Sequence, residues 1–362
     1  MSERLRVTEV YAGGGVGGAI QHLTLLFQTL PREGLDLTVL SLPPHAAAEP
    51  AMAAGLPVTR VADEAQAIRA LGEMPTDILH THGLRPTVIA LRSSFHPWVR
   101  TVHSPLRTDY ASPLKRLAAT LTERRALRAA DATIAVSEAV AGERRRLGAP
   151  AGRLVVIPNA VTPPPAGVSP SALRERLSIS GAARIVLMLS RLQHVKGVDR
   201  AVAALHELPE EWHLVVFGEG PERNALTALA EHSGTAGRLH LLPYEKGGRR
   251  YLEACDVLLI PSRDEGFSMV ALEAQAAGTA VAASRAGGLP LTLGDAAVFF
   301  DDASPRGVAA AVLEADGRAT DLAAKGRQRW GTLFRPEAFA ARTAEVLRSA
   351  ANPSSGGNNY VS

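Results

Sequence analysis

The chain has 362 residues, 46% of them hydrophobic and 21% charged, a composition typical of a globular protein long enough for two domains. Only 4% of the residues are aromatic and the net charge is +3, which argues against a nucleic-acid partner. The single cysteine, Cys255, excludes an internal disulfide, and we expect it to fill the core.

The termini and the charged runs bear on localisation. The first ten residues, MSERLRVTEV, contain no apolar stretch of signal-peptide length, and no run reaches about 18 apolar residues. We therefore expect a cytoplasmic protein. Arginines cluster in ERRALR (Glu123–Arg128) and ERRR (Glu143–Arg146), both within expected helices. We interpret these as solvated faces, with docking on anionic lipid at the inner face of a membrane, or on an acidic partner, as the alternative.

Short β-branched runs alternate with helical patterns along the first half of the chain. The expected strands lie at residues 5–10, 35–40, 77–82, 98–102, 131–136 and 153–158, and the clearest expected helices at 19–30 and 114–129. After Pro158 the segment NAVTPPPAGVSP concentrates proline, which interrupts any regular element.

The same alternation resumes in the second half. The expected strands are residues 184–189, 213–218, 239–243, 256–261 and 279–284, with helices at 199–208, 222–231 and 336–350. Such alternation predicts an α/β protein with two Rossmann-like parallel-sheet domains facing one another. We expect an N-terminal domain at 1–165, a C-terminal domain at 166–335, a helix at 336–350 that packs back on the first domain, and a disordered tail at 351–362.

A glycine-rich loop, YAGGGVGGAIQHL, follows the first expected strand and opens a helix. Gly13, Gly15 and Gly18 have the G-x-G-x-x-G spacing, which lets the backbone approach a phosphate or a sugar. A nicotinamide dinucleotide site also requires an acid at the end of the second strand. Here the only acid of that strand, Asp36, lies at its beginning. A loop needed only for packing is the third interpretation.

Two cations follow the strand at 184–189, in LMLSRLQHVKG. Arg191 and Lys196 lie in the loop before the next helix, at a strand end where open α/β sheets bind ligands. An arginine fork and a lysine point charge suit a diphosphate. Without further support, such a pair more often belongs to a solvated loop.

That support comes from PSRDEGFSMVALEAQAAG, residues 261–278. Ser262 and Glu265 have capping-box spacing, but Gly266 disfavours a helix that early, so we expect the helix to begin near Met269. Glu265 would then lie in a loop, and Glu273 would point inward from the helix. A buried carboxylate needs a partner. The hydroxyls of a ribose are one candidate, and a structural arginine such as Arg191 is the other.

Two histidines, His80 and His82, lie on one face of the strand at 77–82. A metal site is conceivable there, but no third ligand is evident nearby in the sequence. We therefore predict no metal site, and expect His82 either to line a cleft or to be packed in the core.

Taken together, these motifs resemble those of the retaining nucleotide-sugar glycosyltransferases of family 4. The resemblance rests chiefly on Arg191, Lys196 and the Glu265…Glu273 pair, and extends to GGAIQHLTLL, DILHTHG, VHS, ADATIAVSEAV and VIPNAV over nearly the whole chain. It implies the GT-B fold, two Rossmann-like domains across a cleft. The sequence departs from the family at Ala160, where glycine is usual, and at Thr162, where aspartate is usual; both bear on the linker more than on the chemistry.

The resemblance also implies residue roles. Arg191 and Lys196 would bind the diphosphate of the sugar donor and stabilise the departing nucleotide, Glu265 would contact the sugar, and Glu273 the ribose. The remaining contacts implied for the sugar donor come from Phe267, Ser268, Met269 and Val270, from Gly17 and Gly18 near the diphosphate, and from His103 beside the transferred sugar.

We accordingly expect a metal-independent transfer from a UDP- or GDP-type sugar to an acceptor hydroxyl, with retained configuration and no cofactor. The acceptor is unknown: a sugar, a lipid-linked sugar or a small molecule, contacted by loops such as residues 107–113. The alternatives are an NAD(P)-dependent oxidoreductase using the loop from Gly13 to Gly18, and a non-catalytic nucleotide-sugar-binding protein of the same fold.

Overall fold

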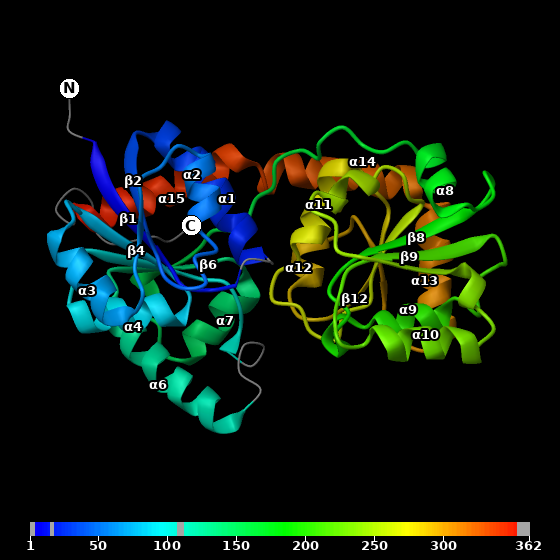
Figure 1. The fold of residues 1–362 in the computed structure, drawn as a ribbon, viewed down its shortest axis with the longest axis horizontal. Coiled ribbons are helices and arrows are strands. Elements are labelled where there is room, and N and C mark those ends of the chain that lie inside the picture. Colours follow the sequence, from blue (N-terminus) through cyan, green and yellow to red (C-terminus); the bar gives the residue numbers. More distant parts are fainter. Residues whose placement is uncertain (1–3, 15–17, 107–111, 353–362) are drawn as a thin grey trace. The chain divides into compact units, whose positions relative to one another are not determined.

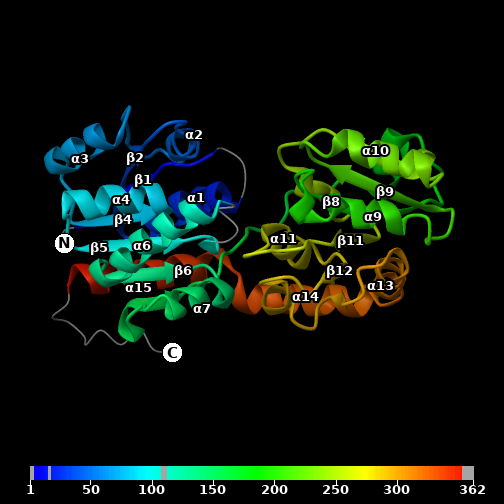
Figure 2. The same cartoon turned by 90° about the horizontal axis from the view of Figure 1, so that it is seen from below.

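The structure is a computed structural model that describes residues 4–14, 18–106 and 112–352. It divides the chain into two compact units. Unit 1 contains the residues up to Ala160 together with those from Arg335 onward, and unit 2 spans Val161–Phe334. Each unit is a parallel sheet with helices on both of its faces, as Figure 1 and the turned view of Figure 2 show.

Unit 1 is built on a seven-stranded sheet in the order β3-β2-β1-β4-β5-β6-β7, and all its strand pairs are parallel. Its strands are β1 (Leu5–Tyr11), β2 (Leu35–Ser41), β3 (Val58–Arg60), β4 (Ile78–His82), β5 (Trp98–Val102), β6 (Ala132–Ala135) and β7 (Leu154–Val156). The strand order reverses between β1 and β4, which is the switch point where such sheets bind ligands.

Alternate side chains of these strands enter two different cores, because successive residues of a strand point to opposite faces. Val7 and Tyr11 of β1 pack in one core, whereas Val10 packs in the other. The first core is covered by α1 (Gly18–Thr29), α2 (Ala48–Ala53) and α15 (Pro336–Ala351). The second is covered by α3 (Glu64–Glu73), α4 (Leu84–Ser93) and α6 (Pro113–Ala129), while α7 (Glu138–Arg146) contacts β6 and β7.

Unit 2 repeats this plan with a six-stranded parallel sheet in the order β10-β9-β8-β11-β12-β13. Its strands are β8 (Arg184–Leu189), β9 (Trp212–Phe217), β10 (Leu239–Leu242), β11 (Val257–Ile260), β12 (Val281–Ser284) and β13 (Val298–Phe300). One core contains α9 (Val198–Ala204), α10 (Arg223–His232) and α13 (Pro305–Gly317). The other contains α8 (Pro170–Leu177), α11 (Met269–Ala277) and α12 (Leu289–Leu293), and α14 (Ala319–Leu333) contacts α11.

The units separate after Ala160, whereas the sequence places that boundary near residue 165. Val161 and Thr162 belong to unit 2 because Trp330 Nε1 donates to the Val161 carbonyl (3.0 Å) and the Arg249 guanidinium donates to Thr162 Oγ1 (3.2 Å). The strands β3 and β13, each of only three residues, were not expected from the sequence. Within the described ranges, no helix combines the length and apolar character needed to cross a membrane.

Candidate active site

The switch point of unit 2 lies between β8 and β11, and the loops that follow these strands are held together by close backbone contacts. Gly197, at φ +68°, ends the loop after β8, and a Cβ there would lie 2.1 Å from the Pro261 carbonyl oxygen. Gly287, at φ +53°, brings the loop after β12 against the Glu265 carbonyl, 1.9 Å from where a Cβ would be. Only glycine permits both approaches, so the loop positions are fixed by the backbone.

These loops bring two of the predicted residues into contact. Lys196 Nζ donates to Glu265 Oε2 at 2.7 Å, and both side chains are largely buried, at 22% and 12% exposure. Arg191, five residues earlier, is exposed and has no ion pair among the described residues. The loops are also joined by Arg263, which donates to Asp199 (2.6 and 2.7 Å). The site therefore places a constrained lysine and an available arginine at the same strand ends.

Helix α11 begins at Met269, as the sequence predicts, so Glu265 lies in the preceding loop. Ser268 is the N-cap residue, and its side chain makes no capping hydrogen bond. The first hydrogen bond to the helix start is donated by the Leu272 amide, to the Ser268 carbonyl. The amides of Met269 and Val270 precede it and have no partner within the helix, which makes this end suited to an anion. Phe267 packs edge-on against Phe334.

Glu273 points inward from α11, as the sequence predicts, and its side chain is almost entirely buried. Burial raises the pKa of Glu273 to about 7, although the attraction of Arg249 lowers it. The arginine that acts on this carboxylate is therefore Arg249 and not the exposed Arg191. The sequence does not indicate Arg249, because the GGRRYLEACD segment shows no periodicity linking it to α11. A carboxylate that titrates near neutral pH inside a loop cluster is typical of a functional site.

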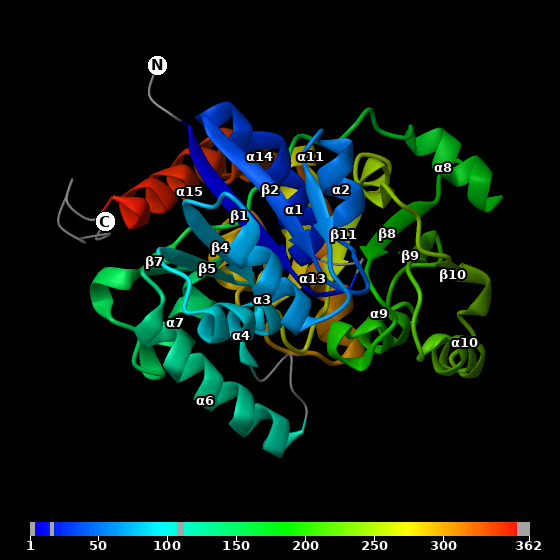
Figure 3. The ribbon, with the colours of Figure 1, turned by 60° about the vertical axis from the view of Figure 1, so that its left-hand side comes forward.

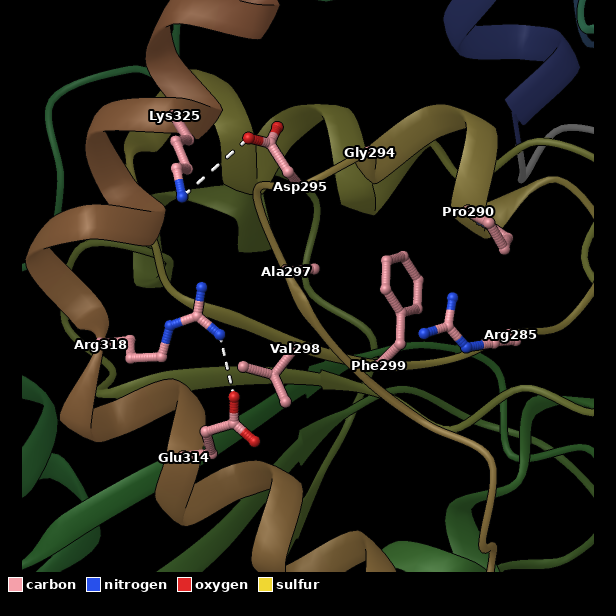
Figure 4. A pocket seen from close by; sticks show the side chains of 10 residues that line it. All are labelled: Arg285, Pro290, Gly294, Asp295, Ala297, Val298, Phe299, Glu314, Arg318 and Lys325. Carbon is pink, nitrogen blue, oxygen red and sulfur yellow. Dashed lines mark hydrogen bonds and ion pairs between the residues drawn. The ribbon is translucent and has the colours of Figure 1, made fainter.

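A surface depression of about 570 Å³ lies elsewhere in unit 2, lined from α12, β13, α13 and α14 (Figure 4). Its charged side chains pair with one another: Arg318 with Glu314 at 2.9 Å and Lys325 with Asp295 at 4.0 Å. None of its lining residues is a predicted site residue. We assign it no role.

At the switch point of unit 1, a buried carboxylate binds two histidines. Glu9 of β1 accepts hydrogen bonds from His80 Nδ1 (3.0 Å) and His82 Nε2 (2.7 Å), because β1 pairs directly with β4. His80 Nε2 bonds Thr101 Oγ1 at 2.9 Å, so both of its ring nitrogens are used. Burial alone would raise the pKa of Glu9, but the attraction and hydrogen bonds of His80 and His82 lower it to about 2.

Two further imidazoles complete this cluster. His103, directly after β5, has its Nε2 3.4 Å from His82 Nδ1, and His22 of α1 has its Nδ1 2.6 Å from Asn159 Oδ1. Burial lowers the pKa of His22 to about 3 and that of His82 to about 4, and it holds the pKa of His103 well below 6.5. His22 Nε2 and His103 Nδ1 are buried without a partner in the described part of the chain.

The predicted residues thus fall in two units. Lys196, Glu265 and Glu273 lie in unit 2 with Arg191, whereas His103 and Gly18, the first residue of α1, lie in unit 1. Gly17, residues 107–111 and the tail from residue 353 lie outside the described residues. The residues that sequence reasoning missed in unit 1 are Glu9, His22 and Asn159, which are far from the histidine motifs in sequence.

The two arginine clusters are not simply solvated. Glu123 accepts hydrogen bonds from Arg100 (2.7 Å) and Arg144 (2.7 Å), and all three side chains are at most 3% exposed. Arg144 also donates to the Ser104 carbonyl at 3.0 Å. The prediction of a solvated face was therefore wrong for Glu123 and Arg144, because strand β5 presents Arg100 to α6 and α7. Arg124, Arg125 and Arg128 are exposed as expected.

Both units match family models. Residues 16–163 match the model of glycosyltransferase family 4, and residues 171–328 match the model of glycosyl transferases group 1. The chain is 35% identical over 282 residues to a D-inositol 3-phosphate glycosyltransferase of Xylanimonas cellulosilytica, covering 69% of this chain and 67% of that protein. A protein of the same name from Acidothermus cellulolyticus is 29% identical over 355 residues, covering 84% and 79%. The match to the Mycolicibacterium gilvum protein covers only 30% of its length.

Solved structures agree on the fold. Sucrose-phosphate synthase from Thermosynechococcus elongatus superposes with a TM-score of 0.80 at 22% identity, over 97% of this chain and all of that chain. Anabaena HepE, solved in complex with UDP, superposes with a TM-score of 0.83 at 21% identity, over 95% and 100%. These likenesses establish the GT-B fold. Together with the matched models and the relatives, they show that the chain is a glycosyltransferase and belongs to glycosyltransferase family 4.

Proposed function

We propose that this glycosyltransferase uses a UDP- or GDP-type sugar, transfers the glycosyl group to an acceptor hydroxyl with retention of configuration, and needs neither a cofactor nor a metal ion on the diphosphate. The observation that carries the proposal is the group of Lys196, Glu265 and Arg191 at the switch point of unit 2, beside the amide end of α11. Two cations and a helix N-terminus are the elements that bind a diphosphate.

In this proposal, the two cations stabilise the leaving group. As the bond between the anomeric carbon and the diphosphate oxygen breaks, negative charge develops on the diphosphate, and Arg191 and Lys196 stabilise it. The acceptor oxygen attacks the same face and bonds to the anomeric carbon. Its proton passes to the departing diphosphate oxygen, so no enzyme nucleophile is required.

The remaining predicted residues position the sugar donor. Glu273 would accept hydrogen bonds from the ribose hydroxyls, and the amides of residues 267–270 would bind sugar and phosphate oxygens. Glu265 would exchange its contact with Lys196 for one with the sugar when the diphosphate arrives. From unit 1, His103 would lie beside the transferred sugar, and Gly17 and Gly18 near the diphosphate.

The test is the rate of nucleotide release from a panel of UDP-, GDP- and ADP-sugars, with water or an added acceptor. Lys196→Ala and Arg191→Ala should each lower kcat about 10²–10³-fold, the usual loss when one charge-stabilising group is removed. Lys325→Ala, on the depression of Figure 4, should leave the rate unchanged. Equal rates in all three variants would contradict the proposal. Proton NMR of the first product distinguishes retention from inversion.

The acceptor is the least constrained part of the proposal. Because the relatives are named D-inositol 3-phosphate glycosyltransferases, inositol 3-phosphate is the first acceptor to assay, followed by other small polyols, sugars and lipid-linked sugars. Nucleotide release that rises only with one of these classes identifies it.

The two alternative functions, an oxidoreductase and a non-catalytic binding protein, predict different assay results from those of a glycosyltransferase. An NAD(P)-dependent oxidoreductase needs an acid at the carboxyl end of β2, but Asp36 lies at its start, paired with Arg4 at 3.0 Å. Absorbance at the reduced-nicotinamide band should therefore not change with candidate carbonyls. A non-catalytic binding protein would bind the nucleotide sugar without releasing nucleotide, so the same release assay excludes it.

We also propose weak association of α6 with an anionic membrane surface. Leu114, Leu117 and Leu121 share one face of α6 and are exposed by 77%, 57% and 59%, with the exposed Arg124 and Arg125 further along the helix. In Figure 3, α6 runs along the periphery of unit 1. Apolar side chains beside arginines are typical of a helix that lies on lipid headgroups.

Sedimentation with vesicles tests this association. Binding should appear with vesicles rich in phosphatidylserine, fall with added salt, and be lost in the variant Leu117→Ser/Leu121→Ser. Sedimentation that does not depend on anionic lipid would contradict it. Arg318→Ser, a surface change in unit 2, is the matched control.

A further inference from the structure

Three imidazoles converge in unit 1 from separate elements. His22 comes from α1, His82 is the last residue of β4, and His103 follows β5. One ring nitrogen of each lies within 4.8 Å of those of the other two. His82 Nδ1 and His103 Nε2 are 3.4 Å apart, close to the separation of about 3.3 Å between two nitrogens bound tetrahedrally to a zinc ion.

Neighbouring side chains fix which nitrogens carry hydrogen. The Glu9 carboxylate only accepts hydrogen bonds, so His82 holds its hydrogen on Nε2 and leaves Nδ1 bare. Asn159 Oδ1 also accepts, so His22 holds its hydrogen on Nδ1 and leaves Nε2 bare. A carboxylate or carbonyl bonded to the far nitrogen is the arrangement that orients metal-binding histidines.

Hydrogen bonds within the protein do not satisfy both of these unprotonated ring nitrogens. His103 can donate one hydrogen, from Nε2 to His82 Nδ1, at a long 3.4 Å. His22 Nε2 then remains a buried acceptor with no partner in the part of the chain that the structure describes. Buried polar atoms without a partner are rare and require an explanation. A cation that accepts one lone pair from each of the three imidazoles would explain this unpartnered nitrogen.

We propose that unit 1 binds one transition-metal dication of the Zn²⁺ class through His22 Nε2, His82 Nδ1 and His103 Nε2, with the fourth position open to a water or ligand oxygen. Three imidazole nitrogens favour Zn²⁺, Ni²⁺ or Cu²⁺ over Mg²⁺ and Ca²⁺, which prefer oxygen ligands. His80 is not a ligand, since Glu9 and Thr101 occupy both its nitrogens. The proposed function assigns the donor diphosphate to Arg191 and Lys196, and we assign this ion no part in binding it.

The experiment uses the full chain, stripped with a chelator and then titrated with Zn²⁺ in competition with a chromophoric chelator. One tightly bound ion per chain is expected, and excess Mg²⁺ should not displace it. Co²⁺ in its place should give the strong visible absorption bands of a tetrahedral site. Cys255 offers no competing thiolate, because burial raises the pKa of its thiol.

Variants identify the ligands. His22→Gln should weaken Zn²⁺ binding by at least 100-fold, and Glu9→Gln, which alters only the group that orients His82, by 10–100-fold. His194→Ala is the matched control, because His194, Asp199 and Glu222 form a more exposed candidate cluster in unit 2. It should leave the tight site intact. Circular dichroism of each metal-free variant establishes that it is folded.

The proposal is overturned if the wild-type chain takes up no stoichiometric Zn²⁺, or if the tight ion survives His22→Gln and disappears in His194→Ala. In the first case, the three rings form a hydrogen-bonded chain without metal. The wild-type stoichiometry decides the matter even if a variant fails to fold. Metal binding tests this proposal and nucleotide release tests the proposed function, so a failure of one is distinguishable from a failure of the other.

Discussion

Glu9 and Glu273 are both buried carboxylates, one in each of two similarly built units, yet their acidities differ by several pH units. Glu9 has a pKa of about 2 because, although burial opposes it, two imidazoles attract its charge and bond both of its oxygens. Glu273 has a pKa of about 7 because burial raises it more than the attraction of Arg249 lowers it. Equal burial therefore does not imply an equal state of ionisation.

The difference indicates what each carboxylate is for. The charge of Glu9 is compensated within unit 1, so its role is to hold His80 and His82 in place. Burial raises the pKa of Glu273 despite the attraction of Arg249, and a carboxylate with a pKa raised in this way is common at ligand-binding sites. Three predictions sharpen this contrast between buried carboxylates whose pKa is lowered and one whose pKa is raised.

The largest effect is expected at Glu123, a buried carboxylate that is paired with two buried arginines. Glu123→Ala would leave Arg100 and Arg144 buried without their shared partner, and the free energy of unfolding should fall by about 3–5 kcal/mol. Urea unfolding followed by tryptophan fluorescence measures it, with the buried Trp98 as the reporter in unit 1 and Trp212 and Trp330 as the reporters in unit 2. In the control, Glu138→Ala removes an exposed pair with Arg145 and should cost less than about 1 kcal/mol. Similar losses in both variants would contradict the prediction.

The next effect is the pH dependence that Glu273 imposes on stability. Its folded pKa of about 7 lies above the unfolded value of 4.5, so the folded protein binds the extra proton between these values. The contribution of Glu273 to the free energy of unfolding is therefore fully present below pH 4.5. It declines as the pH rises through 7, by about 3 kcal/mol in all. Glu273→Gln should be up to about 3 kcal/mol more stable than wild type at pH 8, and equal to it at pH 4.5.

Thermal and urea unfolding of wild type and Glu273→Gln between pH 4.5 and 8 give this difference directly. Glu314→Gln removes an exposed carboxylate of the same unit and should stay within about 0.5 kcal/mol of wild type throughout. A difference for Glu273→Gln that does not change with pH would show that its carboxylate is already ionised at pH 5.

The sequence predicted the local structure around Glu265 and Glu273 well because these residues lie in one short motif. Gly266 correctly placed the start of α11 at Met269, and helical spacing correctly turned Glu273 inward. The sequence could not predict Arg249 as the cation near Glu273, because their proximity depends on how the loop before β11 packs against α11. Strand propensity identified eleven strands and missed β3 and β13, which have three residues each. The strand β7 is equally short, but it lies in the longer apolar run RLVVIP, which made it recognisable.

The unit 1 cluster shows the opposite case. The sequence correctly placed His80 and His82 on one strand face, but it offered no third polar partner. Glu9 is 71 and 73 residues away from these histidines, and it meets them only because the strand order puts β1 beside β4. His22 joins from α1 through its bond to Asn159, 137 residues later. Contacts at such separations follow from topology, which local periodicity does not encode.

The smallest effect, and the one that connects the comparison to function, is on ligand binding. If Glu273 accepts hydrogen bonds from ribose hydroxyls, its ionised form binds better, and binding must expel the proton that it holds below pH 7. The affinity for a nucleoside-diphosphate sugar, whose diphosphate stays ionised throughout, should therefore weaken about tenfold from pH 8 to pH 6, equivalent to about 1.4 kcal/mol.

Isothermal titration calorimetry in buffers of different ionisation enthalpy measures both the affinity and the proton released. Glu273→Gln should bind more weakly at pH 8 and lose the pH dependence. If wild type binds equally at both pH values and releases no proton, the carboxylate of Glu273 does not contact the ribose.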